Sequence, residues 1–95
     1  MTDPHLIAGT TQVLFFHSSS CAECQELERR LVTEGLPVGL TVIKVDFDTY
    51  GDVRDRYGVR TEGTFVQIDG LGKKVRSWSG SGSGADILRR TEAGS

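Results

Sequence analysis

The chain has 95 residues, a length that fits a single domain, because two separate hydrophobic cores would need more sequence. Hydrophobic residues make up 37% of it, enough for a packed core, so we expect one folded domain over residues 1–95. The 11 basic residues do not cluster and are outnumbered by 13 acidic ones. This balance argues against a nucleic-acid-binding protein.

No apolar stretch approaches the roughly 18 residues that a membrane span requires, and the start of the chain lacks the features of a secretory signal. We therefore expect a cytoplasmic protein with no membrane partner. The chain has only two cysteines, Cys21 and Cys24, three positions apart. Two thiols cannot form a disulfide scaffold, and a lone Cys-x-x-Cys pair in such a chain is typical of redox or metal chemistry.

The hydrophobic pattern predicts three elements in the first half of the chain. An apolar run at 12–17 predicts a buried strand. An amphipathic helix follows, with Cys24 and Leu27 on its apolar face and Gly35 at its end. A mostly β-branched run at 41–47 predicts a second strand, long enough to lie centrally in a sheet.

The second half of the chain predicts four more elements. A short helix is expected at 48–57. Two alternating runs, at 63–69 and 73–79, are joined by a turn rich in Gly and Asp and predict a hairpin. A last helix is expected at about 84–91, begun by a serine cap.

This order predicts the α/β class, with the elements arranged as βαβαββα. A strand–helix–strand unit implies a parallel pair of strands, whereas a hairpin adds antiparallel strands. We therefore expect a central mixed four-stranded sheet flanked by helices.

The cysteines lie where the first strand meets the first helix. The segment Ser20-Cys21-Ala22-Glu23 has the form of a capping box, which predicts Ser20 as the N-cap and Cys21 at the first helical position. Free backbone N–H groups and the helix dipole there favour a thiolate, so Cys21 is the candidate nucleophile. Cys24, one turn further on, suits a resolving thiol. The alternative is a pair of buried cysteines that act only as small apolar residues.

Glu23 lies between the two cysteines and has two interpretations. Its negative charge opposes a Cys21 thiolate, which would favour a reductant over an oxidant. Alternatively, Glu23 serves only to cap the helix.

With these features in order, the chain resembles the thioredoxin family over about residues 12–90. The likeness rests on the strand VLFF before Cys-Ala-Glu-Cys, the strand VIKVDFD, the helix end RYGVR and the hairpin GTFVQIDGLGKKV. It resembles a minimal version, in which the family's first strand and helix are missing or shortened into residues 1–11. The resemblance implies a thioredoxin-like fold and a thiol–disulfide oxidoreductase that takes part in electron transport.

The resemblance also implies partners. The substrate would be a disulfide-containing protein or a small thiol compound, and we expect a protein disulfide reductase. A flavoprotein thioredoxin reductase or a small thiol would supply the electrons. No bound cofactor or metal is needed for this chemistry, and we expect a monomer.

Four residues match functional positions of the family. Cys21 matches its nucleophile and Cys24 its resolving cysteine. Lys44 matches the lysine under the active site, and Gly80 matches the glycine beside the substrate groove.

Two departures from the family pattern lie near the cysteines. Ser20 stands where the family usually has a tryptophan, which removes an apolar surface for partner proteins. Phe15 stands where many members have a buried acid. Lys44 would then lack its usual partner, and Asp46, two residues on and facing the same side, is a candidate substitute.

The third departure is the segment Glu62-Gly63-Thr64, which with Gly80 would form the substrate-binding groove. The family has a cis-proline at Gly63, but a non-proline cis bond costs about 3 kcal/mol, so we expect a trans bond here. Gly63 alternatively forms a bulge or a turn with positive φ.

The same departure opens a second function. Without the proline shield, Cys21, Cys24 and His17 could bind a metal or share an Fe–S cluster across a dimer. The chain would then be a metal, cluster or partner-protein binding module with weak or lost turnover. A rim or packing role is the alternative for His17.

Overall fold

The computed structural model describes residues 11–80 and 83–92. The predicted order βαβαββα is confirmed. The strands are β1 (Thr11–His17), β2 (Leu40–Asp46), β3 (Thr64–Ile68) and β4 (Lys74–Ser79), and the helices are α1 (Ala22–Glu34), α2 (Gly51–Tyr57) and α3 (Gly84–Glu92). None of the described helices is long and apolar enough to cross a membrane.

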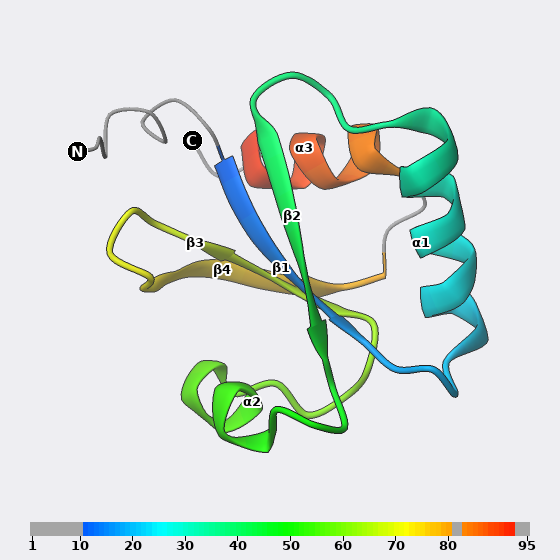
Figure 1. Ribbon diagram of the computed structural model, residues 1–95. Coiled ribbons are helices and arrows are strands. Elements are labelled where there is room, and N and C mark those ends of the chain that lie inside the picture. The colour runs from blue at the N-terminus through cyan, green and yellow to red at the C-terminus, as the bar shows by residue number, and fades with distance from the viewer. Residues whose placement is uncertain (1–10, 81–82, 93–95) are drawn as a thin grey trace.

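The four described strands form one mixed sheet in the order β2-β1-β3-β4 (Figure 1). β1 pairs parallel with β2 and antiparallel with β3, and β3 pairs antiparallel with β4. The mixed sheet is thus confirmed, but the prediction of a central strand at 41–47 is wrong, because β2 lies at the edge of the described strands. A β-branched run predicts a strand but not its position in the sheet. Only Leu40 is buried in β2, whereas β1 has five consecutive buried residues.

Helices cover both faces of the sheet (Figure 1). On one face, α1 and α3 pack over a core that includes Val13, Phe65 and Ile87, all at most 1% exposed. On the other face, α2 packs over a smaller core around Phe16 and Val66. The sheet is therefore the middle layer of the fold. A short turn joins the C-terminal end of β1 to the N-terminal end of α1.

Helix boundaries differ modestly from the predicted ones. α2 begins at Gly51 rather than at 48, because residues 48–50 form a turn in which the Tyr50 N–H donates to the Asp46 carbonyl at 3.1 Å. α3 begins as predicted, since Ser83 Oγ accepts the Asp86 N–H at 3.2 Å. The predicted shortening of the family's first elements falls on residues 1–11, and 1–10 lie outside the described residues.

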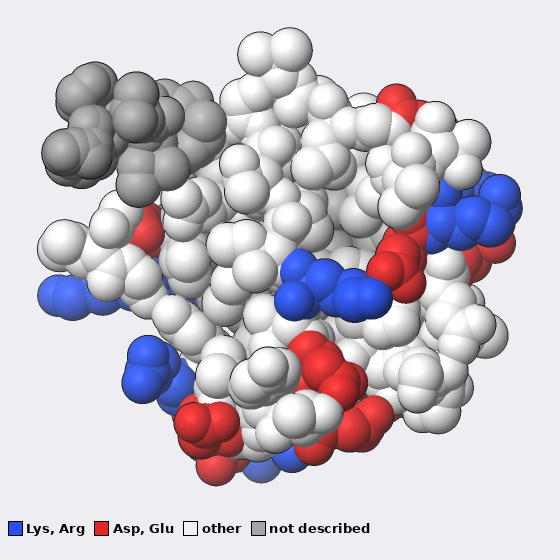
Figure 2. All heavy atoms as spheres, in the orientation of Figure 1, with Lys and Arg blue, Asp and Glu red and all other residues white. Residues whose placement is uncertain are grey.

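Charged side chains of both signs are mixed on the surface. Figure 2 shows Lys and Arg next to Asp and Glu on the face in view, rather than gathered in one basic patch.

Candidate active site

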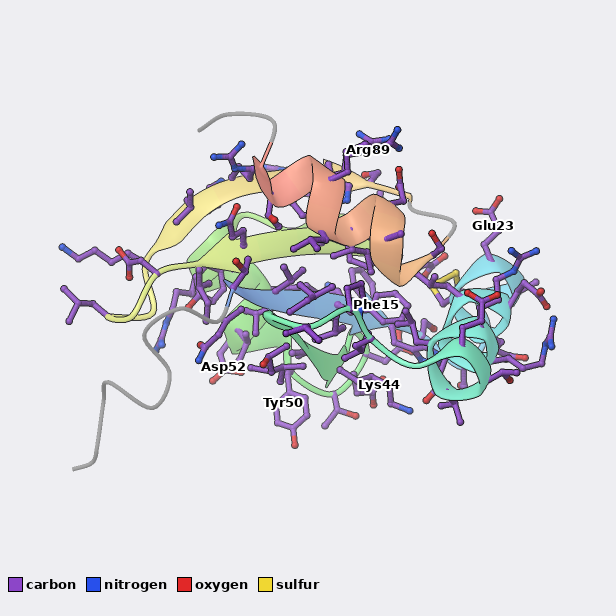
Figure 3. The ribbon with its side chains drawn as sticks, turned by 90° about the horizontal axis from the view of Figure 1, so that it is seen from above. Phe15, Glu23, Lys44, Tyr50, Asp52 and Arg89 are labelled. Carbon is purple, nitrogen blue, oxygen red and sulfur yellow. A yellow bond between two sulfur atoms is a disulfide. The ribbon has the colours of Figure 1, made fainter. Side chains whose placement is uncertain are left out.

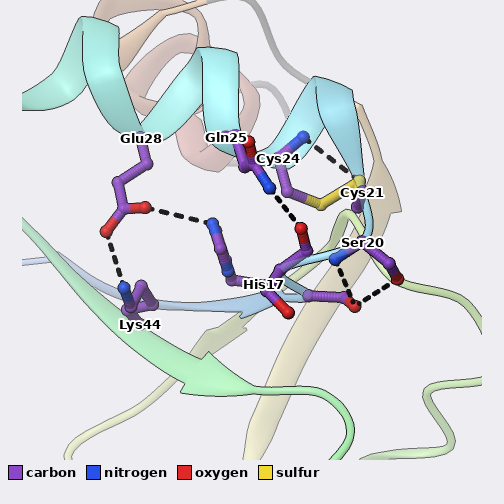
Figure 4. Close-up of polar contacts among 9 residues, drawn as sticks. His17, Ser20, Cys21, Cys24, Gln25, Glu28 and Lys44 are labelled. Atoms are coloured by element: carbon purple, nitrogen blue, oxygen red, sulfur yellow. Dashed lines mark hydrogen bonds and ion pairs between the residues drawn. A yellow bond between two sulfur atoms is a disulfide. The ribbon is translucent and has the colours of Figure 1, made fainter.

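Cys21 and Cys24 form a disulfide at the N-terminal end of α1, with their Cα atoms 5.2 Å apart (Figures 3 and 4). Cys21 is partly exposed, whereas Cys24 is only 2% exposed and belongs to the core under α1. One sulfur thus faces outward and the other lies inward. A partner molecule can reach the first more easily than the second.

The predicted Ser20 cap is wrong, because Cys21 itself is the N-cap of α1. Its Sγ accepts the Cys24 N–H at 3.1 Å. The Ser20 hydroxyl is engaged elsewhere, in a hydrogen bond of 2.9 Å with Ser18 Oγ. Cys21 is therefore not at the first helical position, but its sulfur lies directly against a free N–H at the positive end of the helix.

Ser18 anchors the turn that leads to the cysteines, a role that the sequence analysis missed. Its side chain is fully buried, and its hydroxyl donates to Asp48 Oδ2 at 2.9 Å. The Ser18 carbonyl accepts the Cys21 N–H at 3.0 Å. A run of three serines indicates a turn, but it does not reveal which serine is buried or that Asp48, thirty residues away, is its partner.

A chain of polar side chains, His17, Glu28 and Lys44, runs from β1 through α1 to β2 (Figure 4). His17 Nε2 lies 3.1 Å from Glu28 Oε1, and Lys44 Nζ donates to Glu28 Oε2 at 2.6 Å. The Lys44 hydrogen bond is the main reason why the pKa of Glu28 lies below its ordinary value. The proposed Lys44–Asp46 pairing is therefore wrong. Asp46 instead accepts a hydrogen bond from the Thr49 hydroxyl.

Phe15, for which the resemblance predicts a place where many family members have a buried acid, is 2% exposed. Its ring stacks on Phe65 with centroids 4.8 Å apart, and Phe65 stacks on Trp78 at 5.7 Å. The prediction that Phe65 and Trp78 belong to the core is confirmed. A carboxylate at position 15 would replace a ring of this aromatic stack, with the edge-on His17 ring, whose centroid lies 5.6 Å from that of Phe15, as its polar neighbour.

Gly63 lies beside the inner cysteine. Its φ is +81°, and the described residues contain no cis peptide bond, so the predicted trans bond and the positive φ are both confirmed. The Gly63 N–H donates to the Phe16 carbonyl at 2.8 Å, and its carbonyl accepts the Gly80 N–H at 3.1 Å. A Cβ at Gly63 would lie 3.7 Å from Cys24 Sγ, so this loop is in contact distance of the disulfide.

A cavity of about 280 Å³ opens between α1 and this loop. Its walls come from α1, β1, β3 with the loop before it, and the end of β4. The lining residues are Phe15, Glu23, Cys24, Leu27, Glu62, Gly63, Phe65, Ser79 and Gly80. The structure therefore brings together five of the residues that the sequence singled out, namely Glu23, Cys24, Glu62, Gly63 and Gly80.

The other predicted site residues lie outside the cavity lining. Lys44 is directed to Glu28, as described above. Ser20 is exposed in the turn before α1. Thr64 is buried, and its hydroxyl donates to the Thr61 carbonyl at 2.8 Å, so its side chain holds the loop.

The described part of the chain contains no group of three or more His, Cys, Asp and Glu side chains that could hold a metal ion. The His17 imidazole is directed to Glu28 in Figure 4, away from the two sulfur atoms. A set of Cys21, Cys24 and His17 is thus not assembled within these residues.

The chain is similar in structure to solved thioredoxins. It superposes on a mutant thioredoxin from Halobacterium salinarum with a TM-score of 0.74 and 24% identity, covering 93% of this chain and 77% of the other. Fasciola hepatica thioredoxin gives 0.68 and 28% over 94% and 86%, and Trxlp of Edwardsiella tarda gives 0.68 and 23% over 95% and 93%. No protein-family model and no curated protein sequence matches the chain.

These findings define the class of fold. The chain has the thioredoxin-like α/β fold, as the sequence predicted, and it carries a Cys-x-x-Cys pair at disulfide distance. Together the fold and the bonded pair support thiol–disulfide oxidoreductase chemistry in general.

Proposed function

We propose that the protein is a thiol–disulfide oxidoreductase that reduces disulfides in proteins. The observation that carries the proposal is the Cys21–Cys24 disulfide, with an accessible Cys21 capping α1 and a buried Cys24 behind it. In the reduced form, the N–H that Cys21 Sγ accepts and the positive end of α1 favour its thiolate, which is the attacking species.

The reaction proceeds through two exchanges. The Cys21 thiolate attacks one sulfur of the target disulfide, forms a mixed disulfide and releases the other target sulfur as a thiolate. Cys24, as its thiolate, then attacks Cys21 Sγ, which releases the second target thiolate and forms Cys21–Cys24. Two electrons pass from the protein to the target, and the target thiolates take up two protons.

The proposed reaction also requires an electron donor and a surface that receives the target. A flavoprotein reductase or a small thiol would return two electrons to the disulfide, and no bound cofactor takes part. The protein would act as a cytoplasmic monomer. The loop at Glu62, Gly63 and Thr64, together with Gly80, would receive the target beside Cys24.

A redox titration tests the proposal. The protein is equilibrated in glutathione buffers, alkylated and weighed by mass spectrometry, and insulin disulfide reduction is measured in parallel. We expect a reversible two-electron transition of Cys21 and Cys24 and loss of nearly all activity in Cys21→Ser. Cys24→Ser should accumulate the mixed disulfide. Full activity in Cys21→Ser would contradict the proposal.

A second candidate function is a binding module with weak or lost turnover. Phe15 favours it, because a buried aromatic ring cannot accept a proton from Cys24 during the second exchange. Anaerobic purification with metal analysis and absorbance spectra separates the two functions. A stoichiometric metal or cluster that requires both cysteines would support the binding module, whereas metal-free protein with catalytic turnover would exclude it.

A further inference from the structure

We propose that the cavity beside Cys24 selects disulfides that are flanked by Lys or Arg in a target peptide. This inference rests on the proposed function, because it names the substrate class of the same site. Two carboxylates, Glu23 from α1 and Glu62 from the loop before β3, line the cavity, and no Lys or Arg among the described residues does. A target that enters it meets negative charge on two sides of the buried sulfur.

Both carboxylates are available to a ligand. Glu23 and Glu62 are exposed, and neither forms an ion pair with another residue of the described ranges 11–80 and 83–92. Figure 3 shows Glu23 pointing outward from the first turn of α1, near the disulfide.

The basic groups of α1 and the lysine of the neighbouring strand β2 are already paired with carboxylates. Arg29 and Arg30 form ion pairs with Glu26, at 2.5 and 3.2 Å, and Lys44 forms an ion pair with Glu28. Arg60 is exposed in the same loop as Glu62, two residues earlier, but it does not line the cavity. The cavity mouth therefore keeps a negative balance.

The apolar walls of the cavity strengthen the electrostatic field of the two carboxylates. Phe15, Leu27 and Phe65 form the apolar interior of the cavity and are each at most 5% exposed. A cleft with charges of one sign and apolar walls concentrates oppositely charged ligands and raises their association rate. Each solvent-exposed ion pair gives a factor of about 1.5 to 5, so two together give roughly tenfold discrimination.

A positive flanking residue also assists the exchange itself. When Cys21 attacks one target sulfur, the other leaves as a thiolate, and a neighbouring Lys or Arg stabilises that leaving group. The electron balance is that of the two exchanges above, with the Cys21–Cys24 dithiol as the reductant.

The test uses the pre-reduced full chain and two peptides with the same internal disulfide, flanked by Lys in one and by Glu in the other. Each second-order rate constant is divided by that of dithiothreitol with the same peptide. Dithiothreitol also attacks as a thiolate but has no carboxylates, so the ratio removes the intrinsic reactivity of the disulfide and its attraction to the attacking thiolate. We expect a preference of roughly tenfold for the Lys peptide, which falls below about twofold near 0.5 M salt.

Replacing the two glutamates by glutamine tests whether they cause the preference for the Lys peptide. Glu23→Gln with Glu62→Gln should lower the preference for the Lys peptide to about twofold or less. Glu34→Gln is the matched control, because it removes one exposed charge from the far end of the same helix. Circular dichroism checks that each variant is folded.

Three results would overturn the inference. Equal corrected rates for the two peptides would refute charge selection and leave the proposed function intact. A preference that survives the double variant would assign the selection to other residues. Failure to reduce either peptide or insulin, with both thiols free, would refute the proposed function itself.

Discussion

Gly63 is the residue where backbone conformation and site geometry depend on each other. Its positive φ is one that L side chains rarely adopt, and its N–H holds β1 while its carbonyl holds Gly80. A glycine here keeps the loop close to Cys24 without a cis bond. This glycine therefore holds the loop beside Cys24 with a trans peptide bond and a positive φ.

Substitutions at Gly63 should separate these roles. Gly63→Ala has room for its Cβ, 3.7 Å from Cys24 Sγ, and should lower the free energy of unfolding by about 1 kcal/mol through positive-φ strain. Gly63→Pro requires negative φ and loses the N–H bond to Phe16, so a loss of about 3 kcal/mol is expected. Urea denaturation measures both. A proline variant as stable as the parent would mean that the loop can also adopt a negative φ at position 63.

Glu28 should make the stability depend on pH. Its pKa is lowered in the folded protein, chiefly by the Lys44 hydrogen bond, so the unfolded state binds more protons as the pH falls below the ordinary value of 4.5. The stabilisation is present above that value and is lost as the pH falls through the folded pKa. Because Glu28 is 37% exposed, we expect Glu28→Gln to lose only about 0.5 kcal/mol at pH 7.

The contribution of Glu28 to the free energy of unfolding should vanish in acid. At a pH below the folded pKa of Glu28, where the carboxyl is protonated, the parent and the Glu28→Gln variant should give nearly equal unfolding free energies. Glu34→Gln, whose charge lies at the C-terminal end of α1, serves as the reference in denaturant titrations at both pH values. An undiminished difference in acid would assign the effect to packing rather than to charge.

At the scale of single residues, the sequence predicted the cysteines and the Gly63 loop but not their partners. The spacing and setting of Cys21 and Cys24 are local features, so they could be read directly. The contacts of Glu28 with His17 and Lys44, and of Ser18 with Asp48, join distant segments and depend on the finished packing. Ser20 failed as a cap for the same reason, since Ser18 competes for its hydroxyl.

The helices on the α1 face show how local signals and packing combine. α1 and α3 both follow caps at their first turns and bury residues against the same core, such as Leu27 and Ile87. The sequence predicted these elements to within a few residues, because caps and apolar spacing are local. It did not predict that β2 lies at the edge of the described strands, since strand order depends on pairing between distant segments.

The contribution of the α3 N-cap to stability can be tested by substitution. Ser83→Ala removes the hydroxyl that accepts the Asp86 N–H and should lower the free energy of unfolding by about 1 kcal/mol. Ser77→Ala, at an exposed position in β4, is the matched control and should change it by less than about 0.5 kcal/mol. Chemical denaturation compares the two. Equal losses would show that the Ser83 hydroxyl contributes nothing specific to α3.

The whole molecule consists of one sheet with a core on each face. Val13 lies in the core under α1 and α3, and Val66 lies in the core on the α2 side. Both side chains are 0% exposed, and their strands pair directly. Because one sheet joins the two cores, we expect them to unfold together.

Matched truncations test this cooperativity. Val13→Ala and Val66→Ala should each lower the stability by about 2 kcal/mol and shift the urea midpoint without changing the slope of the transition. Fluorescence of Trp78, near the first core, and far-ultraviolet circular dichroism should report the same midpoint. Two separate transitions in Val66→Ala would show that the α2 side unfolds on its own.

The sulfur of Cys21 caps the N-terminal end of α1 and is also the atom that would attack a target. A free thiolate is a stronger hydrogen-bond acceptor than the neutral sulfur of a disulfide, so the first turn of the helix should be held most firmly before attack. Hydrogen exchange at the Cys24 amide should therefore quicken when Cys21 enters a disulfide and slow again on reduction. This single backbone proton would report the position of the protein in its redox cycle without a chemical label on either thiol.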